Sequence, residues 1–98
     1  MANSQEPREA VLLRVYGLVQ GVSFRAAMQR QARALRLAGW VRNRSDGSVE
    51  ALVAGPPVAV ERLRRWAADG PPAARVDRVL SEPAQAPAAD AFEVRPTL

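Results

Sequence analysis

GLVQGVSFR, residues 17–25, decides the fold, because it separates a strand-like run from a helix-like run. In the run before it, Val11, Leu13 and Val15 share one face of a predicted strand that spans residues 10–16. In the run after it, apolar side chains recur at helical spacing, namely Phe24, Met28, Ala32 and Leu35. The stretch therefore predicts a tight connection from a strand to an amphipathic helix.

The same stretch has the composition of an anion-binding loop. Gly17 and Gly21 permit positive φ angles, so that backbone N–H groups can converge without interference from Cβ atoms. Ser23 is the predicted N-cap of the helix, whose first turn leaves N–H groups unpaired. Arg25 lies in that first turn, where the helix dipole disfavours a cation by about 0.3–1 kcal/mol, a penalty that a bound anion would reverse. We therefore predict a cradle for a phosphate or carboxylate group.

The residue types that the sequence lacks limit its chemistry. It contains no His, Cys or Lys, and all 14 of its basic residues are Arg. Zinc sites made of His and Cys, thiol and imidazole catalysis, and Schiff-base chemistry are therefore excluded. An enzyme built from this chain has to work by positioning and electrostatics, which suits a substrate with a good leaving group. The net charge of +4 favours anionic partners, although a genome-wide codon bias explains the Arg count better.

Length and composition predict a single domain. With 98 residues, 48% of them hydrophobic and 24% charged, the sequence is typical of a globular protein with one core. Residues 1–9 are predicted to form a flexible arm and residues 10–98 the domain. The N-terminus lacks the apolar segment of a signal peptide, and no apolar run approaches the ~20 residues of a membrane span. We expect a cytoplasmic protein that does not associate with membranes.

Turn and helix signals divide the rest of the chain. Gly39 is predicted to end the first helix. Asp46-Gly47, between two strand-like runs, is a strong hairpin signal, and Pro56-Pro57 marks the start of a second helix that ends at Gly70. The further predicted strands span residues 40–44, 49–54, 75–80 and 92–95, and residues 81–90 are predicted to be an extended, mobile connection.

The predicted order of elements is β-α-β-β-α-β with a short extra strand. This order is typical of the ferredoxin-like α+β fold, a two-layer sandwich with both helices on one face of a mainly antiparallel sheet of four to five strands. The helical crossover makes the first and second strands parallel, so that both finish at the same edge. Arg25 and Asn43 are 18 positions apart in the sequence, but this topology predicts that they face one pocket.

Asn43 is unusual because Asn is disfavoured inside strands. Taken alone, it is better explained by turn chemistry. With an arginine and amide cradle at the same edge, the better interpretation is that its side-chain amide, both donor and acceptor, holds and orients a water molecule. Asp46 is explained by the turn and Glu50 by an exposed strand face, so we do not interpret them as a catalytic pair. Trp40 is expected at the core or its rim.

Two motifs resemble those of the acylphosphatase family: Gly17-x-Val19-Gln20-Gly21-Val22-x-Phe24-Arg25, and Gly39-Trp40-Val41-Arg42-Asn43-x-x-Asp46-Gly47-Ser48-Val49-Glu50. The likeness covers about residues 10–95. It implies hydrolysis of acyl phosphates to a carboxylate and inorganic phosphate, without a metal or another cofactor. It also implies that Arg25 and the amides of Gly17, Leu18, Val19, Gln20, Gly21 and Val22 hold the phosphoryl group, and that Asn43 orients the attacking water. We expect a monomer.

The sequence departs from the family pattern at three places. Ser23 stands where many members have glycine, and Ala26-Ala27 is smaller than the residues often found after the arginine. In some members the terminal carboxylate helps to hold the catalytic arginine, and the sequence leaves open whether Leu98 contacts Arg25. None of these departures removes a residue that the chemistry needs.

Two other functions are compatible with parts of this sequence. A nucleic-acid-binding module would use the arginines of the helices, namely Arg30, Arg33, Arg36, Arg62, Arg64 and Arg65. Binding sheets of that kind expose aromatic side chains on central strands, and Phe24 and Trp66 are needed in the core here, so no nucleic-acid partner is expected. The second alternative is a non-catalytic anion-binding domain, because fold does not dictate function. The presence of both Arg25 and Asn43, in a chain without a further domain, favours a stand-alone enzyme.

Overall fold

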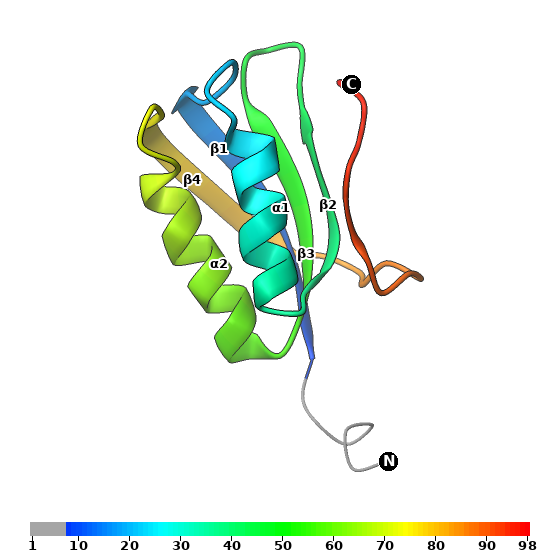
Figure 1. The fold of residues 1–98 in the computed structure, drawn as a ribbon. Coiled ribbons are helices and arrows are strands. Elements are labelled where there is room, and N and C mark those ends of the chain that lie inside the picture. The colour runs from blue at the N-terminus through cyan, green and yellow to red at the C-terminus, as the bar shows by residue number, and fades with distance from the viewer. Residues whose placement is uncertain (1–7) are drawn as a thin grey trace.

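A five-stranded sheet and two helices make up the computed structural model, which describes residues 8–98 (Figure 1). The elements are β1 (Glu9–Leu18), α1 (Phe24–Ala34), β2 (Ala38–Asn43), β3 (Val49–Gly55), α2 (Pro57–Asp69), β4 (Arg75–Pro83) and β5 (Phe92–Val94). This order confirms the prediction of a β-α-β-β-α-β chain with a short extra strand.

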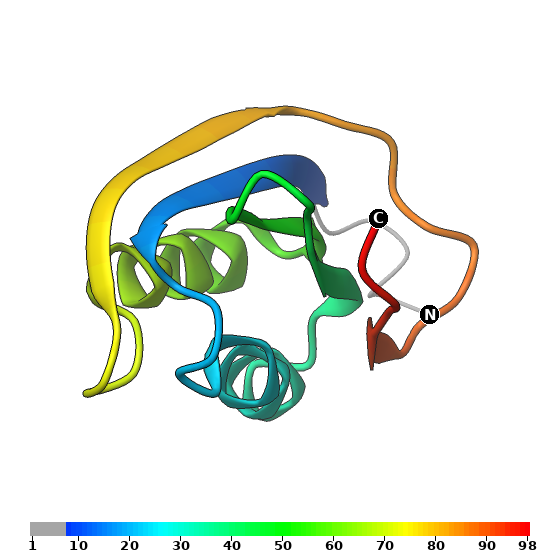
Figure 2. The same cartoon turned by 90° about the horizontal axis from the view of Figure 1, so that it is seen from above.

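The strands lie in the order β4-β1-β3-β2-β5. β1 pairs antiparallel with both β3 and β4, β2 pairs antiparallel with β3, and only β5 is parallel to its neighbour, β2. Because β1 and β2 are both antiparallel to β3, they run in the same direction, as predicted. Both helices cover the concave face of the curved sheet (Figure 2). The ferredoxin-like α+β fold is therefore confirmed.

The core lies between the helices and the covered face of the sheet. The predicted strand face is buried at Val11, Leu13 and Val15, whose exposed fractions are 7%, 0% and 0%. α1 contributes Phe24, Ala27, Met28 and Ala32, and α2 contributes Val60, Leu63 and Ala67. Burial of each larger apolar side chain contributes about 1.5–3 kcal/mol, so this two-layer contact holds the ends of the elements, and hence the site, in place.

The end of α1 differs from the prediction. The helix ends at Ala34, and Arg36 takes the left-handed conformation (φ 58°) that glycine usually occupies. The N–H groups of Arg36 and Leu37 donate to the carbonyl oxygens of Arg33 and Ala32 at 3.0 and 2.9 Å, which is a Schellman ending. The prediction that Gly39 ends the helix is therefore wrong.

Gly39 has a different role, inside β2. Its φ is +138°, and a Cβ atom there would lie 1.8 Å from the carbonyl oxygen of Leu52 on the neighbouring strand. Glycine is required at this position because only a residue without a side chain allows such a close approach of two backbones.

Other element boundaries also differ from those predicted. Glu9, predicted to belong to the arm, begins β1 and pairs with Gly55, whereas the rest of the predicted arm up to residue 7 lies outside the described residues. β1 continues to Leu18 through a bulge between Tyr16 and Gly17. β4 extends to Pro83, so that only the later part of the predicted connection 81–90 is without a strand.

No helix in residues 8–98 is long and apolar enough to cross a membrane.

Candidate active site

A pocket of about 430 Å³ opens at the end of the sheet where β1 and β2 finish. Its walls are formed by Val19, Gly21, Ser23, Arg25, Ala26, Asn43 and Val94. Figure 1 shows why these residues meet: the loop after β1, the start of α1, the β2–β3 turn and the last residues of the chain all lie at this end. The topology thus brings Arg25 and Asn43 to one pocket, as predicted.

The loop between β1 and α1 forms one side of the pocket. Gly21 has a φ of +76° and Ser23 a φ of +64°, so the backbone turns twice into the left-handed region. Within the described part of the chain, the N–H groups of residues 19–23 donate no hydrogen bond to a protein group. Free amides beside a helix N-terminus are an arrangement that binds anions.

The predicted loop residues do not all line this pocket. Gly17 and Leu18 belong to β1 and pair with Val76 and Arg75 of β4. Val19 and Gly21 line the pocket, whereas Gln20 and Val22 do not. The predicted cradle of residues 17–22 thus consists of two strand residues followed by a four-residue loop.

Ser23 occupies the predicted N-cap position, but it does not act as a cap. Its side chain makes no capping hydrogen bond, and its left-handed backbone (φ 64°, ψ 26°) differs from the extended conformation of an N-cap residue. The prediction of Ser23 as a capping side chain is therefore wrong. Ser23 is an exposed serine in a conformation that glycine adopts without strain.

Arg25 supplies the positive charge of the pocket. It lies in the first turn of α1, is half-buried, and makes no hydrogen bond or ion pair with any residue in the range 8–98. No acidic residue lies in that first turn either. A guanidinium group without a carboxylate partner, placed against the positive end of a helix, is arranged to receive an anion.

Asn43 is the last residue of β2 and lies on the same face as Val41, towards the start of α1. Its side-chain Oδ1 atom is buried and has no hydrogen-bond partner within the described residues. Its backbone carbonyl accepts a hydrogen bond of 3.1 Å from the N–H group of Leu98. A buried amide oxygen without a protein partner, in a pocket with an unpaired arginine, can accept a hydrogen bond from a bound water.

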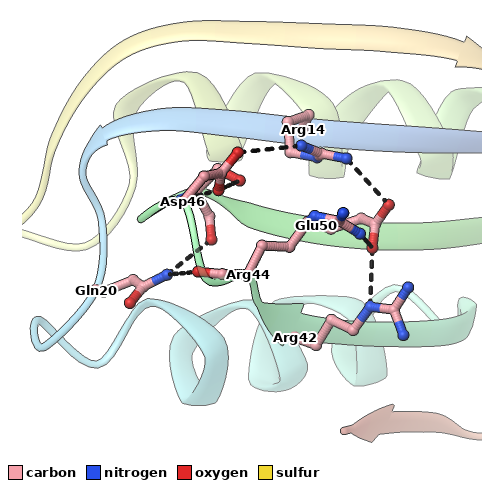
Figure 3. Close-up of polar contacts among 7 residues, drawn as sticks. Arg14, Gln20, Arg42, Arg44, Asp46 and Glu50 are labelled. Carbon is pink, nitrogen blue, oxygen red and sulfur yellow. Dashed lines mark hydrogen bonds and ion pairs between the residues drawn. The ribbon is translucent and has the colours of Figure 1, made fainter. Parts of the chain in front are cut away.

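Glu50 differs most from its prediction, because it is 4% exposed instead of lying on an open strand face. Arg42 Nε and Arg44 Nη1 donate to its Oε1 at 2.8 and 3.1 Å, and Arg14 Nη2 donates to Oε2 at 3.5 Å (Figure 3). Burial raises the pKa of Glu50, but the hydrogen bonds and charges of Arg42 and Arg44 outweigh it, so that the pKa lies below its ordinary value of 4.5. Three arginines are therefore held by one carboxylate behind the site.

The register of the β2–β3 hairpin could have revealed part of this cluster, because it pairs Arg42 with Glu50. Arg14 is the partner of Glu50 on β1, outside the hairpin. Asp46 has the turn role predicted for it, since the N–H and Oγ–H groups of Ser48 donate to its Oδ1 at 2.9 and 2.6 Å. These hydrogen bonds hold the pKa of Asp46 below its ordinary value.

Two further residues, Trp40 and Leu98, do not line the pocket. Trp40 lies on the opposite sheet face from Val41 and is not among the side chains that pack against the core, so the expectation of a place in the core or at its rim is wrong; the guanidinium group of Arg42 lies 4.5 Å from its ring centroid. Leu98 and Arg25, both described residues, form no ion pair with each other within 4 Å. Residues 8–98 contain no group of three or more acidic side chains placed to hold a metal ion.

Known proteins share both the sequence and the fold. A family model described as Acylphosphatase matches residues 11–94. An acylphosphatase of Acidovorax sp. (strain JS42) is 58% identical over 88 residues, which cover 88% of this chain and 89% of that protein. An acylphosphatase of Azoarcus sp. (strain BH72) is 63% identical over 70 residues, 71% of each chain. The structure of an acylphosphatase from Coxiella burnetii has a TM-score of 0.89 at 35% identity and covers 94% of this chain and 99% of that one.

Proposed function

Since this chain belongs to the acylphosphatase family and is a hydrolase that acts on acid anhydrides, we propose that it hydrolyses carboxyl–phosphate mixed anhydrides by metal-independent, in-line attack of water. The products are a carboxylate and inorganic phosphate. The observation that carries the proposal is the meeting of an unpaired Arg25 and the unpartnered Oδ1 atom of Asn43 in one pocket, beside a loop of free amides.

Arg25 and the loop amides hold the phosphoryl group. Phosphoryl transfer through a loose transition state spreads negative charge over the equatorial oxygens, so that catalysis requires mainly positioning and charge stabilisation. The planar guanidinium group can donate to two of these oxygens, and the N–H groups of the loop and of the helix N-terminus can reach the others. Val19 and Gly21, which line the pocket, are the loop positions best placed for this contact.

Asn43 orients the attacking water. Its Oδ1 atom accepts a hydrogen bond from the water, which directs a lone pair of the water oxygen towards phosphorus. The new P–O bond forms as the bond to the acyl oxygen breaks, and the electron pair of that bond leaves with the carboxylate. A phosphoryl oxygen takes the proton of the water, so that no side-chain base is needed. A carboxylate leaves readily, so that no general acid is needed either.

The rest of the pocket is suited to an apolar acyl group. Ala26 and Val94 complete the wall beyond Arg25, and Val94 is 41% exposed. With the phosphoryl group at the loop, the acyl group extends over these two side chains. We therefore propose acyl phosphates with branched or aromatic acyl groups as the preferred substrate class.

The test is hydrolysis of benzoyl phosphate in the presence of EDTA by the wild type and by Asn43→Ala. We expect rapid turnover by the wild type. In Asn43→Ala, kcat should fall by an amount that corresponds to several kcal/mol of lost transition-state stabilisation, and the inhibition constant of phosphate should change little. Circular dichroism of both proteins controls for folding. A folded wild type that binds phosphate but does not hydrolyse benzoyl phosphate would leave only the alternative of an anion-binding domain.

The predicted lack of a nucleic-acid partner, the monomeric state and the cytoplasmic location stay predictions. The arginines named for the nucleic-acid alternative are exposed or half-buried, Arg36 lies just after the end of α1, and Arg64 and Arg65 pair with Glu61 on their own helix. This arrangement is that of a solvated helix face.

A further inference from the structure

We propose that the side chain of Gln20 is a positioning residue, which fixes the distance between the phosphate-binding loop and Asn43. This inference rests on the proposed function, since it assigns a role in the same reaction. In the resemblance to the family, Gln20 contributes only a backbone amide to the cradle, and no role falls to its side chain.

The contacts of Gln20 lead away from the pocket. Its Nε2 atom donates to the carbonyl oxygens of Arg44 and Ser48 at 2.8 and 2.9 Å (Figure 3). Arg44 directly follows Asn43, and Ser48 directly precedes Val49, the partner of Asn43 on β3. Gln20 therefore holds both chain segments that leave the Asn43–Val49 pair.

The two hydrogen bonds are not needed to close the β2–β3 turn. The Ser48 carbonyl oxygen already accepts from the Arg44 N–H group at 2.9 Å, and the Arg44 carbonyl oxygen accepts from the Gly47 N–H group at 3.1 Å. The bonds from Gln20 add a connection between the turn and a loop that lies 24 and 28 positions earlier in the sequence. They join the two halves of the site.

The loop needs such a connection. The N–H groups of residues 19–23 make no hydrogen bond to a protein group within the described residues; Val19, 1% exposed, and the half-buried Val22 pack against the core, but neither contact joins the loop to the β2–β3 turn. Without Gln20, the amides that hold the phosphoryl group can move relative to the amide that holds the water. Because in-line attack depends on the separation of water and phosphorus, a displacement of about 1 Å can cost on the order of a hundredfold in rate.

The chemistry of the contact restricts the residue type. Both acceptors are carbonyl oxygens, so only a side chain with two N–H donors can bind both of them at once. A carboxylate in place of the amide would meet two oxygens with its own negative charge, and a methionine of similar length would offer no donor.

The test measures kcat for benzoyl phosphate and the inhibition constant of phosphate for wild type, Gln20→Met, Asn43→Ala and the double variant. We expect Gln20→Met to lower kcat by about tenfold or more and to leave the inhibition constant within about twofold, because the cradle itself is intact. In the Asn43→Ala background, Gln20→Met should cause no further loss, since Gln20 acts through Asn43. Gln20→Asn, which keeps the donors on a shorter side chain, provides the same comparison if Gln20→Met does not fold.

Three results would overturn the inference. A Gln20→Met protein with wild-type kcat would show that the contact does not affect the reaction. If Gln20→Met lowered kcat by the same factor in the wild type and in the Asn43→Ala background, Gln20 would act independently of Asn43. An Asn43→Ala protein with wild-type kcat would overturn the proposed role of Asn43 and this inference with it. The single-variant rates distinguish these cases, because only the last leaves Asn43→Ala active.

Discussion

Replacing Arg25 with alanine should make the protein more stable without ligand and less stable in the presence of phosphate. Arg25 lies in the first turn of α1, which holds no acidic residue, and Arg25 pairs with no residue in the range 8–98. A cation at a helix N-terminus costs about 0.3–1 kcal/mol, so its removal should raise the free energy of unfolding by about 0.5 kcal/mol. For a domain of this size that corresponds to an increase in Tm of about 3 °C.

Phosphate should make the wild type more stable than Arg25→Ala, which reverses the order of stability found without ligand. At a concentration of about 100 times its Kd, phosphate stabilises the wild type by about 2.7 kcal/mol. The loss of two charge-assisted hydrogen bonds, each about 1.5–3 kcal/mol, should weaken binding to Arg25→Ala by at least about a hundredfold. The same phosphate concentration then stabilises the variant by only about 0.4 kcal/mol, so that the wild type becomes the more stable protein by about 2 kcal/mol.

The assay is thermal unfolding followed by circular dichroism over a phosphate titration. Arg30→Ala is the matched control, because Arg30 is exposed in the middle of the same helix and does not line the pocket. It should show the phosphate response of the wild type. The reasoning is refuted if Arg25→Ala gains as much stability from phosphate as the wild type does, or if the two curves do not cross.

Three further variants test other parts of the account. Ser23→Gly should raise the free energy of unfolding by about 0.5 kcal/mol in urea denaturation, because relief of left-handed strain (about 1–2 kcal/mol) exceeds the entropic cost of glycine (about 0.5–1 kcal/mol); a loss of stability would contradict the strain. Glu50→Gln should destabilise the protein by about 2 kcal/mol at pH 7, since three arginines lose their shared carboxylate. Folding lowers the pKa of Glu50, so the ionised carboxylate contributes fully to the free energy of unfolding above pH 4.5, and this contribution declines as the pH falls below that value. The loss of stability in acid should therefore be smaller in Glu50→Gln than in the wild type. Equal losses in the two proteins would count against the cluster. Val94→Ser should reduce the ratio of kcat/KM for benzoyl phosphate to that for acetyl phosphate by about tenfold, and an unchanged ratio would exclude Val94 from the acyl wall.

The fold could be predicted from the sequence because its signals are local and agree with one another. The alternation of Val11, Leu13 and Val15 and the helical spacing of Phe24 and Met28 each indicate one buried face, and the structure buries both. Once the order of elements is known, the handedness of the crossover places the end of β1 near the end of β2. That step also predicted the meeting of Arg25 and Asn43.

The end of α1 was predicted wrongly because a glycine near the end of a helix has two possible explanations, a helix C-terminus or a close approach of another strand. A glycine after an amphipathic run usually marks a helix C-terminus. Here Arg36 accepts the left-handed conformation, and Gly39 is required by the approach of Leu52 from β3. Gly39 and Leu52 are 13 positions apart in the sequence, so the local preference for glycine at helix ends carries no information about their contact.

The roles of Glu50 and Gln20 depend on tertiary structure in the same way. A strand pattern that alternates charged and apolar residues indicates an open face, but it does not show that Arg14, Arg42 and Arg44 fold over the carboxylate. The side chain of Gln20 lies in a loop without local pattern, and its partners are the carbonyl groups of a turn that forms only when the sheet is assembled. Such contacts become visible only when the register between strands is known.

The most direct test of the central claim is hydrolysis of benzoyl phosphate by the wild type in water enriched in ¹⁸O, with mass analysis of both products after a single turnover. If the water beside Asn43 attacks the phosphoryl group held by Arg25, the label enters inorganic phosphate and benzoate stays unlabelled. Label in benzoate would place the attack at the carbonyl carbon and contradict the account of this pocket as a phosphoryl-transfer site.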